Sequence, residues 1–196
     1  SQGGKGWNVK IANYFIKQLG NDISANLSYI NFGLSVDIND AGDRIIVGDP
    51  SYNGARGTAQ VFQWDGENWN LIFDFIVSSI PDTTTLGVAQ LGTSVSINGT
   101  GNIIAIGAPY NDGNGSSSGH VRVYYWSGTA WTQRGLDIDG EAANDYSGFS
   151  VSLSSDGSIV AIGAFDNHGV NGSYSGHVRV YYWSGTSWIQ RGLDID

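Results

Sequence analysis

Gly119-His-Val-Arg-Val-Tyr-Tyr-Trp-Ser-Gly-Thr129 recurs without change at residues 176–186, an offset of 57 residues. Its valines alternate with polar residues and are followed by three aromatic residues, which is typical of a strand, and the segment runs into a Ser-Gly-Thr turn. Ile103–Ala108 recurs as Ile159–Ala164 at an offset of 56, and a more divergent copy occupies residues 33–50. Self-similarity at this period predicts an array of equal structural units.

Each unit is predicted to contain four short strands, separated by turn residues such as Ser155-Asp156-Gly157. In the last unit we place these strands at residues 149–153, 159–164, 177–183 and 188–193. Six of the seven tryptophans flank the final hairpin loop of a unit. We expect each pair to face across two strands and stabilise the hairpin; the pairs are Trp64 with Trp69, Trp126 with Trp131, and Trp183 with Trp188.

Four antiparallel strands in about 57 residues predict a blade of a β-propeller, an all-β fold whose blades pack face to face within a larger propeller or repeat array. We expect strands at residues 7–11 and 14–18 from a preceding blade, completed by further sequence or by a neighbouring molecule. Unfinished end blades would then favour self-association. The expected divisions are the end of a preceding blade with its linker, followed by three blades: 1–31, 32–90, 91–146 and 147–196.

Composition excludes several functional classes. The chain has 196 residues with 9 Lys and Arg against 18 Asp and Glu, a net charge of −9, so a nucleic acid partner is not expected. It has no cysteine, which excludes disulfides and thiolate metal sites. No apolar run approaches the length of a membrane span, so we expect no membrane insertion.

Three pairs of segments resemble the FG-GAP repeat of integrin alpha-subunit propellers. They are Phe32-Gly33 with Val47-Gly48-Asp49-Pro50, Leu91-Gly92 with Gly107-Ala108-Pro109, and Ser147-Gly148 with Gly163-Ala164-Phe165. The resemblance spans about residues 14–196. It implies a propeller that serves adhesion or ligand recognition outside the cell, usually with seven blades. The fungal lectin built on the same propeller is similar in appearance.

That family often binds calcium in the loop between the first two strands of a blade, through alternating aspartates. The corresponding loops here are too short, so we expect no cofactor. Calcium remains an alternative in one linker between blades, through Asp137, Asp139 and Asp145. Ser24 stands at the place of Asp139 in an earlier linker, which favours solvated acids over a repeated ion site.

The sequence predicts no enzyme. No histidine pair has metal-ligand spacing, and the chain has no nucleophile elbow, phosphate-binding loop or cysteine nucleophile. His120 and His177 stand at equivalent places in two units, each two residues before an arginine, Arg122 and Arg179. Because residues two apart share a strand face, these side chains predict a polar ladder between blades.

Two functions remain open. The first is an extracellular or surface recognition or adhesion module that binds a protein or a glycan. The alternative is a structural repeat of a surface filament or virion fibre whose main partner is itself. Loops that follow the second strand vary between units, and this variation favours recognition.

Those loops and the linkers between blades are expected on one rim, where each loop offers an aromatic ring beside carboxamides. The candidate ligand-binding residues are Tyr52, Asn53, Tyr110, Asn111, Asp112, Phe165, Asp166, Asn167 and His168. Glycosylation sequons lie in predicted loops, where they would be used if the chain is secreted; they start at Asn26, Asn98, Asn114 and Asn171.

Overall fold

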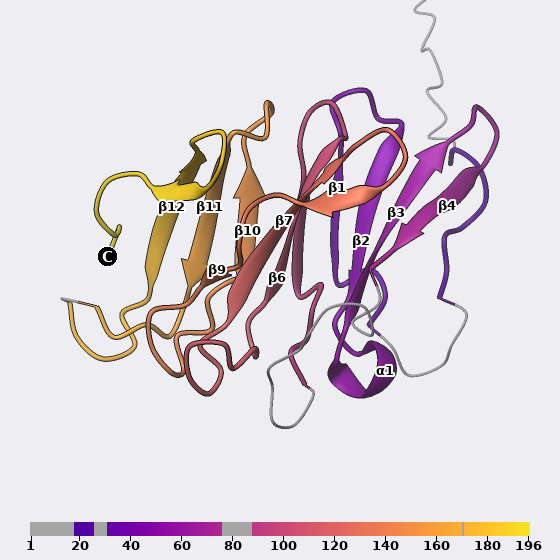
Figure 1. Cartoon of the computed structure of the whole chain (residues 1–196). Helices are drawn as coiled ribbons and strands as arrows, with labels where there is room; N and C mark the ends of the chain where they lie inside the picture. The colour runs from indigo at the N-terminus through magenta and orange to yellow at the C-terminus, as the bar shows by residue number, and fades with distance from the viewer. Residues whose placement is uncertain (1–17, 26–30, 76–87, 170) are drawn as a thin grey trace, which may run out of the picture.

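The computed structural model describes residues 18–25, 31–75, 88–169 and 171–196 (Figure 1). The strands expected at residues 7–11 and 14–18, and the sequon at Asn26, lie outside the described residues, Gln18 excepted. Within the described residues there are thirteen strands and one helix of four residues, so the fold is all-β as predicted.

The strands form three antiparallel sheets, each with its strands in chain order. The first sheet contains β1 (Ser35–Ile38), β2 (Arg44–Asp49), β3 (Thr58–Trp64) and β4 (Trp69–Asp74). The second contains β5 (Ser94–Ile97), β6 (Ile103–Ala108), β7 (His120–Trp126) and β8 (Trp131–Gln133), with the short β9 (Ile138–Asp139) also paired to β7. The third contains β10 (Ser150–Leu153), β11 (Ile159–Ala164), β12 (His177–Trp183) and β13 (Trp188–Gln190).

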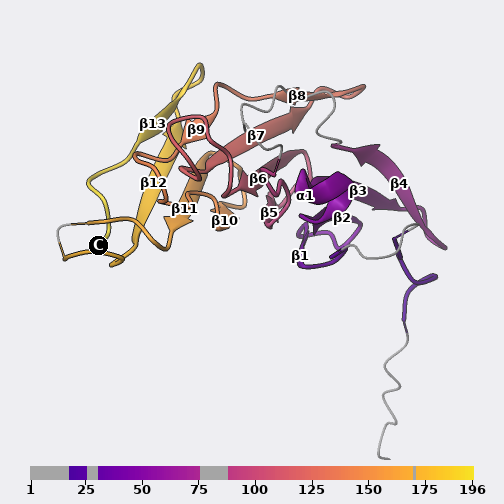
Figure 2. The same ribbon diagram turned by 90° about the horizontal axis from the view of Figure 1, so that it is seen from below.

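The sheets stand side by side as a fan of propeller blades (Figures 1 and 2). Their first strands β1, β5 and β10 lie together, and their last strands diverge on the opposite side (Figure 2). Hairpin turns next to these first strands are joined by backbone hydrogen bonds from Asp40 to Gly99 (3.0 Å) and from Gly99 to Ser155 (2.8 Å). The sheets do not close into a ring, and the arrangement is that of a partial propeller.

The glycines of the FG-GAP-like segments set the contact between blades. Gly148 has a φ of +87°, which favours glycine, and its carbonyl oxygen accepts a 2.7 Å hydrogen bond from the Ser94 hydroxyl of the preceding blade. A Cβ atom on Gly107 would overlap this oxygen. Gly92 lies in the same way against Gly48 and Ser35. Close backbone approach therefore explains why both segments of the motif contain glycine.

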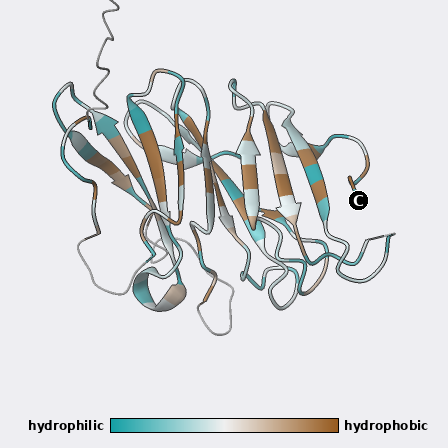
Figure 3. Cartoon of the chain, turned by 180° about the vertical axis from the view of Figure 1, so that it is seen from behind, coloured by the Kyte–Doolittle hydropathy of each residue, from teal (hydrophilic) through white to brown (hydrophobic). Residues whose placement is uncertain are grey.

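The second blade buries both faces, which explains its continuous apolar strand β6. Ile104 and Ile106 pack toward the first blade with Ile46, in one cluster of buried residues. Ile103 and Ala105 pack toward the third blade, in a second cluster. Because side chains alternate across a strand, one apolar run supplies both interfaces. Figure 3 shows hydrophobic residues along the strands of the sheets.

The tryptophan pairs are confirmed, with ring centroids 5.4–5.6 Å apart across each last hairpin. The fourth strand of the last blade is shorter than predicted, because β13 ends at Gln190. The chain then leaves the edge of the sheet, and Ile195 returns to pair with Val178. In the second blade, β9 pairs with β7 in the same way. The segment between Gln190 and Ile195 contains Asp194, and the equivalent segment of the second blade contains Asp137.

Candidate functional site

A row of four aromatic rings lies where the loops after β6 and β11 meet the linker between the second and third blades. Tyr110 packs on Tyr146 with centroids 5.2 Å apart, Tyr146 stacks on Phe165 at 5.3 Å, and Phe149 meets Phe165 at 4.7 Å. Phe149 and Phe165 are 46% and 51% exposed, although both are large and apolar. We call these four residues the aromatic row.

The backbone holds this row in place. Tyr146 has a φ of +53° and donates its backbone N–H to the carbonyl of Ser117, at 3.1 Å. Phe149 donates its N–H to the Tyr146 carbonyl, also at 3.1 Å, and Gly119 forms a parallel bridge with Ser147. The linker and the loop after β6 are thus fixed to one another, and the ring positions follow from this pairing.

The carboxamides expected beside these rings have a structural role. Asn111 and Asn167 are buried, and Asn111 Oδ1 accepts a 2.8 Å hydrogen bond from the backbone N–H of Gly113. Asp112 accepts the backbone N–H of Ser117. The rim therefore presents aromatic rings, with Asp166 partly exposed and His168 exposed and packed against Tyr174 at 4.6 Å.

The first blade contributes a separate surface. Its loop after β2 forms the single-turn helix α1 (Tyr52–Ala55), in which Asn53 is exposed with a φ of +50°. Tyr52 lines a cavity of about 250 Å³ together with Phe62 and Asp74. Burial raises the pKa of Asp49 at this cavity. The structure does not bring Tyr52 and Asn53 into the aromatic row.

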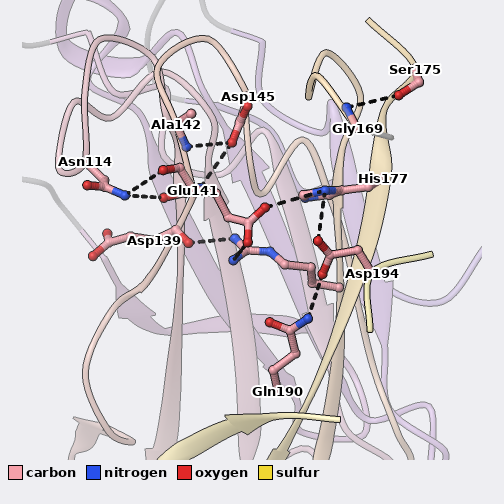
Figure 4. Close-up of polar contacts among 12 residues, drawn as sticks. Asn114, Asp139, Glu141, Ala142, Asp145, Gly169, Ser175, His177, Gln190 and Asp194 are labelled. Carbon is pink, nitrogen blue, oxygen red and sulfur yellow. Dashed lines mark hydrogen bonds and ion pairs between the residues drawn. The ribbon is translucent and has the colours of Figure 1, made fainter. Parts of the chain in front are cut away.

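The sequons differ in accessibility. Asn98 is 2% exposed and its amide donates to Thr100 and Asn102, so the prediction of a glycan there is wrong for the folded chain. Asn114 is exposed, but its amide already donates to the carbonyls of Gly140 and Glu141 (Figure 4). Asn171 is exposed and remains a candidate for modification.

The three linker acids do not form a common ion site. Asp145 is 1% exposed and accepts the backbone N–H groups of Glu141 and Ala142, so it caps a turn (Figure 4). Asp137 is bound at 2.8 Å by both the Nε and Nη2 atoms of Arg122. Only Asp137 and Asp139 lie near one another, beside His120. The grouping of Asp145 with them is wrong because its carboxylate is used within the linker.

The pKa values of these two acids are shifted in opposite directions. Burial raises the pKa of Asp137, but the hydrogen bond and charge of Arg122 outweigh it, so the pKa is lowered overall. Burial, followed by the charge of Asp137, raises the pKa of Asp139. Asp137 is therefore a paired carboxylate, whereas Asp139 is more easily protonated.

Sequence reasoning found two members of the aromatic row, Tyr110 and Phe165, and missed Tyr146 and Phe149. These two flank the Ser147-Gly148 segment of the motif, where the earlier copy has Gln90 and Thr93 instead. The sequence signal that could have found Tyr146 and Phe149 is that aromatic residues stand at both places only at the junction between the second and third blades. A groove of about 490 Å³ between the 135–139 segment and the hairpin of β12 and β13 was also not foreseen.

A family model matches part of this chain. Residues 87–124, which span β5, β6 and most of β7, match the family model described as FG-GAP repeat. A search of curated proteins found no match. Within the described residues, no helix has the length and apolar character needed to cross a bilayer.

Solved structures with a similar arrangement include TolB from Acinetobacter baumannii, at 13% identity over 81% of this chain and 32% of that one, with a TM-score of 0.45. Sqt1 from Saccharomyces cerevisiae matches at 12% identity over 85% and 36%, with a TM-score of 0.49. Kuenenia stuttgartiensis hydrazine synthase matches at 7% identity over 87% and 38%, also at 0.49. The chain spans about a third of the length of each. The chain thus folds as blades of a partial propeller, and residues 87–124 within it match the FG-GAP repeat.

Proposed function

We propose that this chain is a recognition module of an extracellular, cell or virion surface, which binds a glycan through the aromatic row. The observation that carries the proposal is the exposure of Phe149 and Phe165 on a rim that is otherwise built from polar loops. Aromatic faces stack on the apolar faces of sugar rings, and a surface of this kind suits binding rather than catalysis.

The row is preorganised for such binding. Its rings come from two loops and a linker that are fixed by backbone hydrogen bonds, including those of Tyr146. A ligand would therefore meet rings that lose little conformational freedom on binding, which supports affinity. Four rings form a small patch compared with a stable protein interface, which favours a glycan over a folded protein partner.

A glycan array with the wild-type chain, followed by calorimetry with the best ligand, tests the proposal. The double variant Tyr110→Ala with Phe165→Ala removes one ring from each loop, and stacking contributions of about 0.5–1.5 kcal/mol per ring predict a loss of about fivefold or more. Tyr125→Ala removes a tyrosine that is 41% exposed on β7, outside the row, and is the control. Unchanged affinity in the double variant would refute the site.

Self-assembly is a second candidate, favoured by one observation. In the first two blades, the motif serine and glycine are covered by a glycine carbonyl of the next blade. In the third blade, a Cβ on Gly163 would meet only Ser150 of its own blade, so the same serine and glycine can take up this contact with a blade of a second copy. Sedimentation that shows concentration-dependent association, abolished by Gly163→Val, would support this role.

A further inference from the structure

Three potential metal-ligating atoms converge where the linker after the second blade meets the third blade. Nδ1 of His177 lies 3.8 Å from Oε2 of Glu141 and 3.8 Å from Oδ2 of Asp194. One ligand atom from each residue lies within 4.8 Å of the others. Figure 4 shows both carboxylates directed at the same edge of the imidazole ring.

The His177 ring is buried, and its Nδ1 faces the two carboxylates. Its side chain is 2% exposed, its Nε2 has no hydrogen-bond partner among the described residues, and its Nδ1 lies 3.8 Å from each carboxylate. Buried polar groups are nearly always hydrogen-bonded. The 3.8 Å separations are too long for a hydrogen bond. They are close to the roughly 3.4 Å that separates ligand atoms around a tetrahedral ion with metal–ligand bonds of about 2.1 Å.

The equivalent residues of the second blade are arranged differently, although the strand sequences are identical. There, Arg122 binds both oxygens of the equivalent aspartate, Asp137. In the third blade, Arg179 turns away and donates to the carbonyl of Asp139, at 2.7 Å. Asp194 is then bound only through Oδ1, by Gln190 at 2.6 Å, and its Oδ2 faces the imidazole.

Charge at the cluster favours a cation. Two carboxylates lie close together, and the guanidinium of Arg179 approaches only the far oxygen of Glu141, at 3.7 Å. With a neutral imidazole, the group therefore has one uncompensated negative charge, which a divalent ion would offset. Glu141 and Asp194 are 45% and 30% exposed, so an ion can reach the cluster from solvent.

We propose that Glu141, His177 and Asp194 bind a zinc-class divalent cation, with a fourth position open to water. An imidazole nitrogen with two carboxylate oxygens suits zinc better than calcium or magnesium, which prefer oxygen ligands alone. Because Glu141 belongs to the linker and the other two residues to the third blade, the ion would join these segments. This site is independent of glycan binding at the aromatic row.

Direct metal binding by the untagged, chelator-treated chain tests the site, with Zn²⁺ measured by calorimetry and Co²⁺ by its visible absorption. The expected result is one Zn²⁺ per chain and displacement of Co²⁺ by Zn²⁺. Glu141→Gln and His177→Gln should each weaken binding by about tenfold or more, since each removes one of three protein ligands. Zn²⁺ should raise the melting temperature of the wild type and not that of Glu141→Gln.

His168→Gln and His120→Gln are the matched controls and should bind Zn²⁺ as the wild type does. Glu141 is half-exposed, so its isosteric amide should leave the fold intact, which circular dichroism checks. Absence of Zn²⁺ binding by the wild type would overturn the proposal. Full binding by Glu141→Gln, or loss of binding in His120→Gln alone, would also overturn it.

Discussion

Replacement of Gly107 by alanine tests whether the motif glycines are required by contact between blades. The new Cβ would lie 2.9 Å from the carbonyl carbon of Gly148 and overlap its oxygen. The Gly148 turn would have to withdraw by about 1 Å, which breaks the 2.7 Å hydrogen bond from Ser94. Overpacking costs about 1–3 kcal/mol, and the hydrogen bond contributes about 1 kcal/mol.

We therefore expect Gly107→Ala to lower the free energy of unfolding by about 2–4 kcal/mol. At about 2–4 °C per kcal/mol for a chain of this size, the melting temperature should fall by at least about 4 °C. Thermal and urea unfolding followed by circular dichroism measure both quantities.

Gly163→Ala is a matched control within the same chain. Gly163 stands at the same place in the third blade, but the close contact of its Cβ would be with the hydroxyl of Ser150, which is exposed and can rotate. Its effect should stay within about 1 kcal/mol of zero, since alanine also restricts the unfolded chain. Equal destabilisation by both variants, or none by Gly107→Ala, would refute the role assigned to blade contact.

Three further predictions concern single side chains. Trp188→Phe removes the 2.7 Å indole hydrogen bond to the Arg134 carbonyl and should cost about 1–2 kcal/mol in urea unfolding. Burial, as the largest effect, raises the pKa of Tyr124 to about 12. An ultraviolet titration of Tyr124→Phe should therefore lack only the tyrosine ionisation that the wild type shows at the highest pH. Burial raises the pKa of Asp137, but Arg122 outweighs burial, so the pKa is lower in the folded chain than in the unfolded chain. The stability that Asp137 contributes is therefore complete above the pKa of the unfolded chain and is lost as the pH falls through the pKa of the folded chain. Asp137→Asn should therefore flatten the decline in stability below about pH 4.

The strands of the repeat were predictable because their signals are local. The strands expected at 159–164 and 177–183 match β11 and β12 at both ends, and the tryptophan spacing fixed the last hairpins. The two-residue β9 was missed because its pairing with β7 depends on the path of the linker and has no periodic signal.

The candidate site was only partly predictable. Loop chemistry pointed to Tyr110 and Phe165, but their link through Tyr146 required the linker to pack against both loops. The same packing buried Asn111 and Asn167, which the sequence suggested as ligand-binding groups. Burial of a loop amide depends on its neighbours in space and cannot be read from a turn signature.

The sequence alone determined that the chain builds four-stranded blades, because the alternation of side chains, the turn residues and the repeat act over short distances. Only the tertiary structure decided what the repeated residues do. His120 and His177 begin identical strands, yet Arg122 pairs with Asp137 in one blade while Arg179 is drawn to the linker in the next. The reason is physical: each strand face meets a different neighbour, and Glu141 lies beside His177 and Arg179 of the third blade.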